Sequence, residues 1–247
     1  MDIVKKSDFV EIKYTGYVNG EVFDSNIEED LKKLNPKAKP KKTIVIVGQK
    51  MLVPGFDDAL EGKEIGKDYE INVEVKDGFG ERKRELVKTI PLKIFTDKKI
   101  DPRPGMVFDM DNMLAKVIAV SGARVVTDFN NPLAGKILTY KFKIVRRIVE
   151  EKEKVESVLE LLFKFVPDFE IKDKIIVKGP KAFGPYIDMI KDKFKELIGK
   201  ELGFEEKEEK ISSEEKKEGL DDIKKEIKRE NTSEESKKDE ENERVST

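Results

Sequence analysis

The amino-acid sequence predicts an α+β protein that combines antiparallel strands, a short helix and a C-terminal α+β module. Polar and apolar residues alternate from Asp8 to Val18, and Asn19-Gly20 is a strong hairpin-turn signal. Pro54 suits the first turn of a short helix in VPGFDDALEG, and Gly62 suits the stop after it. After about residue 150 the apolar spacing becomes helical.

The composition excludes several classes of chemistry. Among 247 residues, 41% are charged, yet the net charge is only -2, so no global field attracts nucleic acid or an anionic membrane. The chain contains no Cys and no His, which removes thiolate nucleophiles, His general bases and disulfides, and makes a zinc site implausible. We therefore expect no nucleic-acid partner and no metal. The Lys- and Glu-rich composition is typical of heat-adapted intracellular proteins.

Further strands are predicted along the first half of the chain. Residues 27–42 carry two prolines and many lysines, which predicts a surface excursion before the apolar run 44–47. Alternation over 69–75 and again over 138–144 predicts two half-buried strands. The DGFG sequence at 77–80 ends the first of these, and we expect the second to rejoin the opening sheet.

The remaining segments predict an inserted unit, a module and a tail. Residues 84–127 contain short apolar runs separated by DPRPG and Ser121-Gly122, which favours a small β unit. Residues 150–206 show two helical stretches with short apolar runs between them, which predicts an α+β module. The segment 207–247 holds 11 basic and 15 acidic side chains and few apolar ones, which predicts disorder or a lone solvated helix.

Three short motifs fail on spacing. GKEIGK at 62–67 has three residues between its glycines and Asp68 after the lysine, so it lacks the spacing and the hydroxyl of a phosphate loop. DMDN at 109–112 is followed by Met113 where a calcium loop needs an oxygen ligand. GFG at 78–80 lacks the third glycine of a dinucleotide fingerprint, so we interpret it as a turn.

Four motifs in a fixed order carry a family resemblance. They are YTGYVNGEVFDSN, IVGQKMLVPGFDDALEGKEIG, KDGFG and, after the insertion, DFNNPLAGKILTYKFKIV. Over residues 7–148 the chain resembles the FKBP-type peptidyl-prolyl cis-trans isomerases, in their long archaeal, SlyD-like form. The resemblance implies an antiparallel half-barrel wrapped on a short helix (1–83 with 128–149), an inserted flap domain (84–127), a C-terminal module (150–206) and a charged tail (207–247).

The resemblance also implies an apolar catalytic cleft and no cofactor. Its expected members are Tyr14, Phe23, Asp24, Leu52, Val53, Phe56, Phe79 and Tyr140, with Leu133 binding substrate beside them. Taken singly, each apolar member could be an ordinary core residue. We expect Asp24 to accept a hydrogen bond from Tyr14. Two positions depart from the family pattern, because Phe56 replaces a tryptophan and Phe79 replaces a tyrosine whose hydroxyl binds a substrate carbonyl.

The inserted domain implies a second activity, the binding of unfolded chains. Methionine-rich apolar surface adapts to varied partners. The candidate substrate-binding residues are Ile90, Leu92, Ile94, Met106, Phe108, Met110 and Met113. They could equally form the core of this small unit, and we expect some to be buried and others exposed.

The expected partners are unfolded or proline-containing polypeptides, and the apolar stripes of residues 150–206 could close on themselves or on a second copy as a homodimer. No signal peptide or membrane span is recognisable, which favours the cytoplasm. Two functions remain open: an isomerase with attached chaperone activity, or a holding chaperone with a weak isomerase site.

Overall fold

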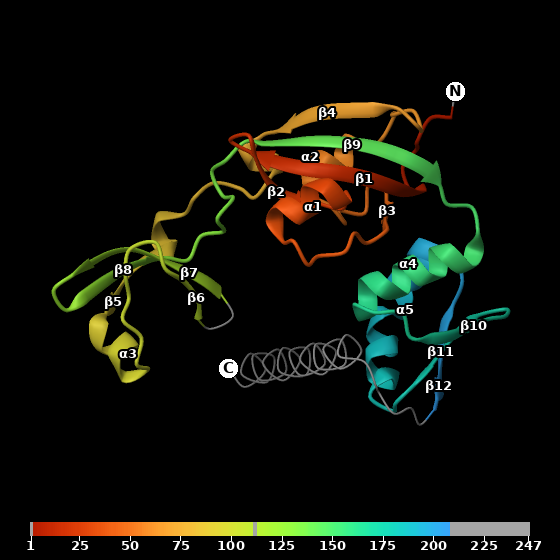
Figure 1. Cartoon of the computed structure of the whole chain (residues 1–247). Coiled ribbons are helices and arrows are strands. Elements are labelled where there is room, and N and C mark those ends of the chain that lie inside the picture. The colour runs from red at the N-terminus through yellow and green to blue at the C-terminus, as the bar shows by residue number, and fades with distance from the viewer. Residues whose placement is uncertain (1, 111–112, 208–247) are drawn as a thin grey trace, which may run out of the picture. The chain divides into compact units, whose positions relative to one another are not determined.

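The structure is a computed structural model that describes residues 2–110 and 113–207 (Figure 1). The chain divides into two compact units, the first spanning Met1–Arg147 and the second beginning at Ile148. Within the described residues, no helix has the length and apolar composition needed to cross a bilayer. The tail predicted from residue 207 lies, except for Lys207, outside the described residues.

The first unit is built on a five-stranded antiparallel sheet. Its strands are β1 (Phe9–Val18), β2 (Glu21–Ser25), β3 (Thr43–Ile46), β4 (Asp68–Val73) and β9 (Leu138–Arg147). They follow the order β2-β1-β9-β4, and β3 pairs with the N-terminal half of β1 while β2 pairs with its C-terminal half. The strand at 138–144 therefore rejoins the opening sheet as predicted, and the α+β half-barrel class is confirmed.

A short helix closes the core of this sheet. Helix α2 (Pro54–Asp58) begins at the predicted proline and lies against the inner face of the strands (Figure 1). Phe56 from the helix and Leu60 after it are fully buried among apolar side chains of β1 and β9. The solvent-exposed face of β9 instead carries lysines that form ion pairs with acidic residues of β4.

Residues 27–42 are not wholly irregular, because they contain helix α1 (Glu28–Leu34). Acidic residues occupy its first turn, and Lys32 and Lys33 its last, which suits the helix dipole. Two ion pairs, Glu28–Lys32 and Asp30–Lys33, join neighbouring turns. The helix buries none of its own residues, so charge placement rather than an apolar stripe accounts for it.

The inserted segment forms a four-stranded antiparallel sheet and one helix, which we call the flap. The flap contains β5 (Val87–Pro91), α3 (Leu92–Asp97), β6 (Val107–Met110), β7 (Met113–Ser121) and β8 (Arg124–Asp128), in the sheet order β5-β8-β7-β6. The 3-10 turn Val75–Asp77 precedes the flap, and the 3-10 turn Arg84–Leu86 begins it. Helix α3 was not predicted; it buries Phe95 against Val117 and Val125, which gives this small sheet a core.

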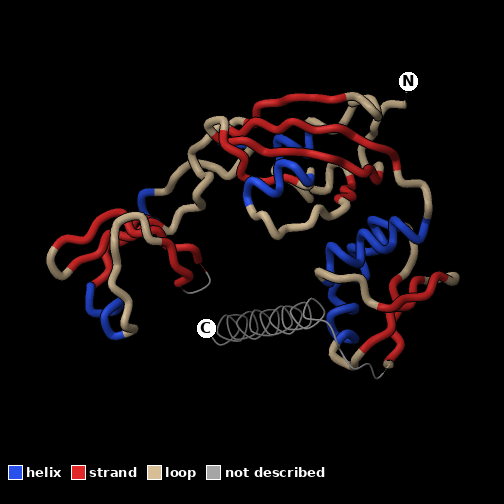
Figure 2. Tube along the Cα trace, in the orientation of Figure 1, coloured by secondary structure: helices blue, strands red, loops and turns tan. Residues whose placement is uncertain are grey.

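The second unit packs two helices with three strands (Figure 2). Its elements are α4 (Glu151–Phe163), β10 (Asp168–Ile171), β11 (Ile175–Gly179), α5 (Phe183–Ile198) and β12 (Leu202–Glu206). The predicted helices and short strands are present, and β12, which pairs parallel to β11, was missed. Phe163, Phe183 and Tyr186 form an edge-to-face aromatic cluster between the helices.

Candidate functional site

The β1–β2 hairpin places the first motif. Asn19 and Gly20 both have positive φ values, 51° and 82°, as a tight hairpin turn requires. Gly16 lies opposite Asp24, but Tyr17 lies opposite Val22, so Phe23 has no residue across from it. Such bulges redirect a side chain. Here the Phe23 ring is redirected over Gly16.

Gly16 is required for that arrangement. A Cβ at this position would lie 2.7 Å from Phe23 Cζ, closer than real Cβ contacts, and would make a tight contact of 3.0 Å with Tyr140 Cε1. The missing side chain lets the two rings meet edge to face, with centroids 5.8 Å apart. Gly16 is a structural determinant that the sequence reasoning missed, although it stands inside the quoted motif.

Tyr14 and Asp24 form the predicted pair. The Tyr14 hydroxyl donates a hydrogen bond to Asp24 Oδ2 at 2.9 Å, which confirms this geometric prediction. Burial, the Asp24 charge and this hydrogen bond together raise the pKa of Tyr14 well above its ordinary value. The hydroxyl therefore remains protonated near neutrality and acts as a donor, not as a base.

Asn26 anchors the end of β2 beside this pair. Its side chain accepts a hydrogen bond from the Tyr14 backbone N–H at 2.8 Å and donates to the Ile12 carbonyl at 2.8 Å. The amide thereby continues the backbone ladder where β2 stops, and it holds Tyr14 in position. Sequence reasoning assigned no role to Asn26, and its place directly after Asp24-Ser25 was the only signal.

Phe56 and Tyr140 form a stacked apolar floor. Their ring centroids are 4.4 Å apart with an interplanar angle of 22°. The Tyr14 ring meets Phe56 edge to face at 5.7 Å. Leu52 and Val53, which precede α2, pack partly buried against the same core. We call Tyr14, Phe23, Asp24, Leu52, Val53, Phe56 and Tyr140 the aromatic site.

Asp57 fixes the loop that carries Leu52 and Val53. This carboxylate is buried and accepts backbone hydrogen bonds from Gly48 at 3.2 Å and Lys50 at 2.7 Å. A buried carboxylate needs hydrogen-bond donors, and these two backbone N–H groups supply them. The two bonds also connect the loop after β3 to the start of α2. It acts as a positioning residue outside the aromatic site.

The Tyr140 hydroxyl is a free donor in this site. The side chain is only 2% exposed, and no described residue forms a hydrogen bond with the hydroxyl. Among the described residues, Thr127 Oγ1 is the one side-chain polar atom that is both fully buried and without a hydrogen bond. The Tyr140 oxygen also lacks a hydrogen bond, so it is not fully buried and retains solvent access. Burial, and secondly the charge of Asp24, raise the pKa of Tyr140, which keeps its proton in place.

Phe79 and Leu133 lie on two loops that are joined to each other. Gly135 N donates to the Gly80 carbonyl at 2.8 Å, which ties the 75–80 loop to the 131–135 loop. Leu133 packs against the main core, as a site member would. Phe79 is 37% exposed and makes no ring contact with the described aromatic side chains, so its place in the catalytic cleft stays a prediction.

The candidate residues of the flap divide into two groups. Ile90, Leu92, Phe108 and Met110 are partly buried against the flap core, whereas Ile94, Met106 and Met113 are exposed. The three most exposed apolar residues of β6 and β7 are Val107, Leu114 and Ile118, which were not among the selected candidates. Strand alternation was the signal, because Val107 and Leu114 flank residues that face the core.

Asp128 and Asn130 fasten the flap at its base. Asn130 Oδ1 accepts from Lys83 N at 2.8 Å, and Asn130 Nδ2 donates to the Lys83 carbonyl at 3.0 Å and to Asp128 Oδ1 at 2.7 Å. Arg82 pairs with the other oxygen of Asp128. Burial raises the pKa of Asp128, but the Asn130 hydrogen bonds and the Arg82 charge outweigh it and hold the pKa below its ordinary value.

The chemistry available at the aromatic site is binding and polarisation. Within the described residues, no three His, Cys, Asp or Glu side chains come together as metal ligands would. The site offers an apolar floor, one carboxylate already bonded to Tyr14, and one free hydroxyl. These groups suit a reaction in which no covalent bond is broken.

Known proteins resemble the chain over this region. The sequence model of the family described as FKBP-type peptidyl-prolyl cis-trans isomerase matches residues 2–110, and that of the FKBP26 IF domain matches residues 88–133. A short-type peptidyl-prolyl cis-trans isomerase of Methanocaldococcus jannaschii is 33% identical over 147 residues, covering 58% of this chain and 94% of the relative.

Two further relatives match less of their own length. The FKBP-type isomerase SlyD of Haemophilus influenzae is 34% identical over 103 residues, covering 40% of this chain and 53% of the relative. A trigger factor of Mycoplasma capricolum is 25% identical over 176 residues, covering 69% of this chain and 34% of the relative. With the half-barrel, the flap and these similarities, the chain belongs to the FKBP-type peptidyl-prolyl cis-trans isomerase family and is SlyD-like.

Proposed function

We propose that the aromatic site accelerates rotation about Xaa-Pro peptide bonds while the exposed apolar residues of the flap hold unfolded chains. The observation that carries the proposal is the Tyr14–Asp24 hydrogen bond at the edge of the stacked Phe56–Tyr140 floor. An apolar floor with two polar groups at its edge fits a proline ring and the amide beside it.

The reaction needs stabilisation of a twisted amide. Resonance gives the planar bond a rotation barrier of about 18–20 kcal/mol, and uncatalysed Xaa-Pro isomerisation takes tens of seconds. Excluding water disfavours the polar planar amide relative to the less polar twisted one, and each tenfold acceleration needs only about 1.4 kcal/mol. A chain without His or Cys can supply this.

Tyr140 supplies the donor that Phe79 lacks. Phe79 has no hydroxyl and is 37% exposed. The Tyr140 hydroxyl is protonated, solvent-accessible and without a partner among the described residues, so it can donate to the substrate carbonyl. Asp24 orients Tyr14 and presents its charge beside the same carbonyl region. No proton is transferred in this mechanism.

The flap would extend the activity to protein substrates. Ile94, Met106 and Met113 are exposed, together with Val107, Leu114 and Ile118 from β6 and β7. Clusters of exposed apolar side chains in a small sheet favour interaction with other chains. The clients, a homodimer through residues 150–206, and a cytoplasmic location remain predictions.

Two substrates separate the two activities. The assays are isomerisation of an Xaa-Pro peptide and refolding of a proline-limited protein, with wild type, the double variant Asp24→Ala with Tyr140→Ala, and a chain lacking residues 84–127. We expect the double variant to lose both activities and the deletion to lose protein refolding alone. If wild type accelerates neither substrate, the isomerase proposal fails; if it only suppresses aggregation, the chain is a holding chaperone. Light scattering with and without residues 150–206 tests the homodimer.

A further inference from the structure

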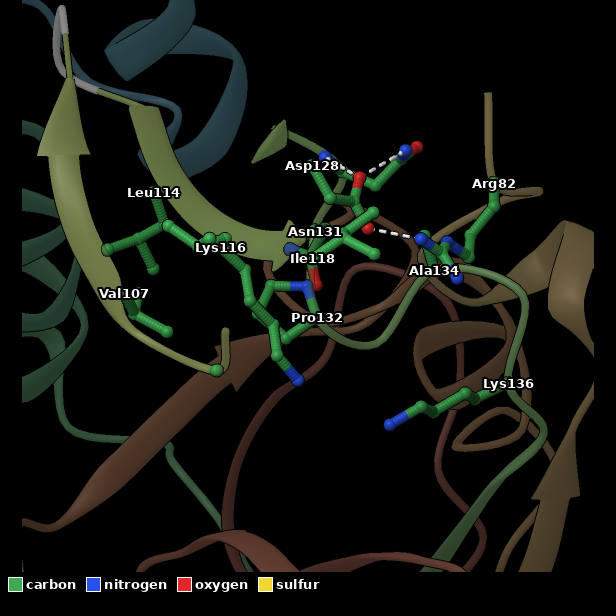
Figure 3. A pocket seen from close by; sticks show the side chains of 13 residues that line it. Arg82, Val107, Leu114, Lys116, Ile118, Asp128, Asn131, Pro132, Ala134 and Lys136 are labelled. Carbon is green, nitrogen blue, oxygen red and sulfur yellow. Dashed lines mark hydrogen bonds and ion pairs between the residues drawn. The ribbon is translucent and has the colours of Figure 1, made fainter. Parts of the chain in front are cut away.

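A cavity of about 540 Å³ lies between the flap and the segment 128–137 that leads into β9 (Figure 3). Its size is within the range of ligand pockets, about 300–1,000 Å³. It shares no lining residue with the aromatic site. The cavity is therefore a separate feature of the first unit.

The floor of this cavity is apolar because of the strand register. Val107 lies opposite Lys116, and Phe108 lies opposite Ala115, so Val107, Leu114 and Lys116 project from the face opposite the flap core. Val107 and Leu114 are 54% and 56% exposed. Ile118 lines the same cavity and is also exposed. Such apolar side chains gain free energy when a partner covers them.

The cavity has a net positive charge. Lys116 extends from β7 and Lys136 from the returning segment (Figure 3), and neither forms an ion pair with a described residue. Asp128, the acidic residue in the lining, already accepts bonds from Arg82 and Asn130. Asp128 also lies opposite Lys116 in the β7–β8 register, so the lining holds three cations, Arg82, Lys116 and Lys136, against one carboxylate.

The whole flap shares this charge bias. Residues 84–127 contain eight Lys and Arg against five Asp and Glu, a net charge of +3 in a chain whose total is -2. Among the described residues, Arg103 is the one flap cation with an ion pair, to Asp101. A positively charged apolar surface attracts acidic partners and repels basic ones.

We propose that this cavity is a second client subsite that selects extended, unfolded segments carrying an acidic side chain beside an apolar one. The inference rests on the proposed flap function and names the chemistry of its client. The apolar neighbour covers Val107, Leu114 and Ile118, while the carboxylate forms ion pairs with Lys116 and Lys136. Proline is not needed here, because the aromatic site is elsewhere.

The test uses two fluorescent, unfolded peptides without proline that differ only in having Glu or Lys beside each leucine. Fluorescence anisotropy measures their binding to the full chain. We expect the Glu peptide to bind wild type about fivefold more tightly, with a preference that shrinks in high salt. The variant K116E/K136E should reverse the preference. The matched control K93E/K98E changes the same net charge on and beside α3, outside the cavity, and should keep it.

Other outcomes are equally informative. Equal binding of both peptides, or the same loss in both charge-reversal variants, overturns the subsite while leaving the flap function standing. Binding of neither peptide overturns the flap function as well. Self-association of the free chain in light scattering that K116E/K136E abolishes would identify a second copy as the occupant and overturn the client assignment.

A second pair of variants keeps the test independent of charge reversal. Leu114→Ala removes apolar surface inside the cavity, and the matched control Leu34→Ala removes it from the exposed end of α1, outside the flap. We expect Leu114→Ala alone to weaken the Glu peptide several-fold. Equal effects of the two substitutions would contradict the location of the subsite.

Discussion

Tyr140→Phe gives the sharpest test of the site, because it removes one oxygen and leaves the ring. The ring stacks on Phe56 at 4.4 Å and is almost wholly buried, and phenylalanine preserves both features. The hydroxyl bonds to no described residue, so its removal breaks no internal hydrogen bond. Any loss of activity then reports on contact with the substrate.

The expected magnitude follows from one hydrogen bond. A neutral hydrogen bond contributes about 1 kcal/mol net, which corresponds to about fivefold in kcat/KM. Because no internal bond is lost, the free energy of unfolding should change by less than about 0.5 kcal/mol. Tyr14→Phe is the matched control, since it breaks the 2.9 Å bond to Asp24 and should lower stability by about 1 kcal/mol.

The assay is isomerisation of a chromogenic Xaa-Pro peptide alongside urea unfolding of each variant. Tyr140→Phe should lose activity at unchanged stability, and Phe79→Tyr in wild type should add little, because Tyr140 already supplies a donor. Full activity in Tyr140→Phe would refute the donor role. A stability loss equal to that of Tyr14→Phe would refute the reasoning about its free hydroxyl.

Four further outcomes are expected. The pKa values of Tyr14 and Tyr140 are raised above the ordinary 10.0, so stability is full below about pH 10 and falls as pH rises further; tyrosinate absorbance should show both ionising late. Gly16→Ala should cost about 1–3 kcal/mol of stability and reduce peptide turnover, because two rings occupy the space of its Cβ. Asp57→Ala should cost about 2 kcal/mol in urea unfolding, since two backbone donors lose their acceptor. Asn130→Ala should weaken catalysis of refolding of the proline-limited substrate protein while turnover of the Xaa-Pro peptide stays unchanged, because the base of the flap loses its hydrogen bonds.

Each of these outcomes has a control. Gly184→Ala, within α5, places its Cβ 3.5 Å from Phe204, an ordinary contact, and should stabilise the second unit slightly. Asp24→Asn should bring both tyrosine pKa values closer to normal while burial keeps them raised. Asp57→Asn keeps an acceptor and should cost less than Asp57→Ala. Normal titration of both tyrosines, or peptide turnover lost in Asn130→Ala, would contradict the corresponding prediction.

The sequence predicted the strands, turns and helix ends that depend on neighbouring residues. Alternation located the strands, Asn19-Gly20 located the turn, and Pro54 located the start of α2, because each depends on neighbouring residues alone. Helix α1 escaped prediction because it has no buried stripe and is stabilised by ion pairs between its own turns. Helix α3 escaped because Phe95 is its one buried residue, so the sequence shows no helical spacing of apolar residues there.

The sequence predicted those site residues whose closeness in space follows from their order along the chain. The hydrogen bond between Tyr14 and Asp24 follows from two strands of one hairpin, whose separation the turn fixes. Phe79 could not be placed in this way. It lies on a loop whose path depends on the bond between Gly135 and Gly80, a contact between distant parts of the sequence.

The sheet holds the free hydroxyl of Tyr140 in a fixed position. Tyr140 lies on β9, the strand between β1 and β4, and its neighbours across the ladder are Gly16 and Ile71. A donor held by two flanking strands and stacked on Phe56 moves less than one on the loop at residue 79, so less ordering is required when the substrate carbonyl arrives. A donor fixed in the sheet also does not depend on flap position, because the flap branches from the segment before β9. Peptide turnover should accordingly tolerate changes in the flap, whereas turnover of protein substrates should follow them.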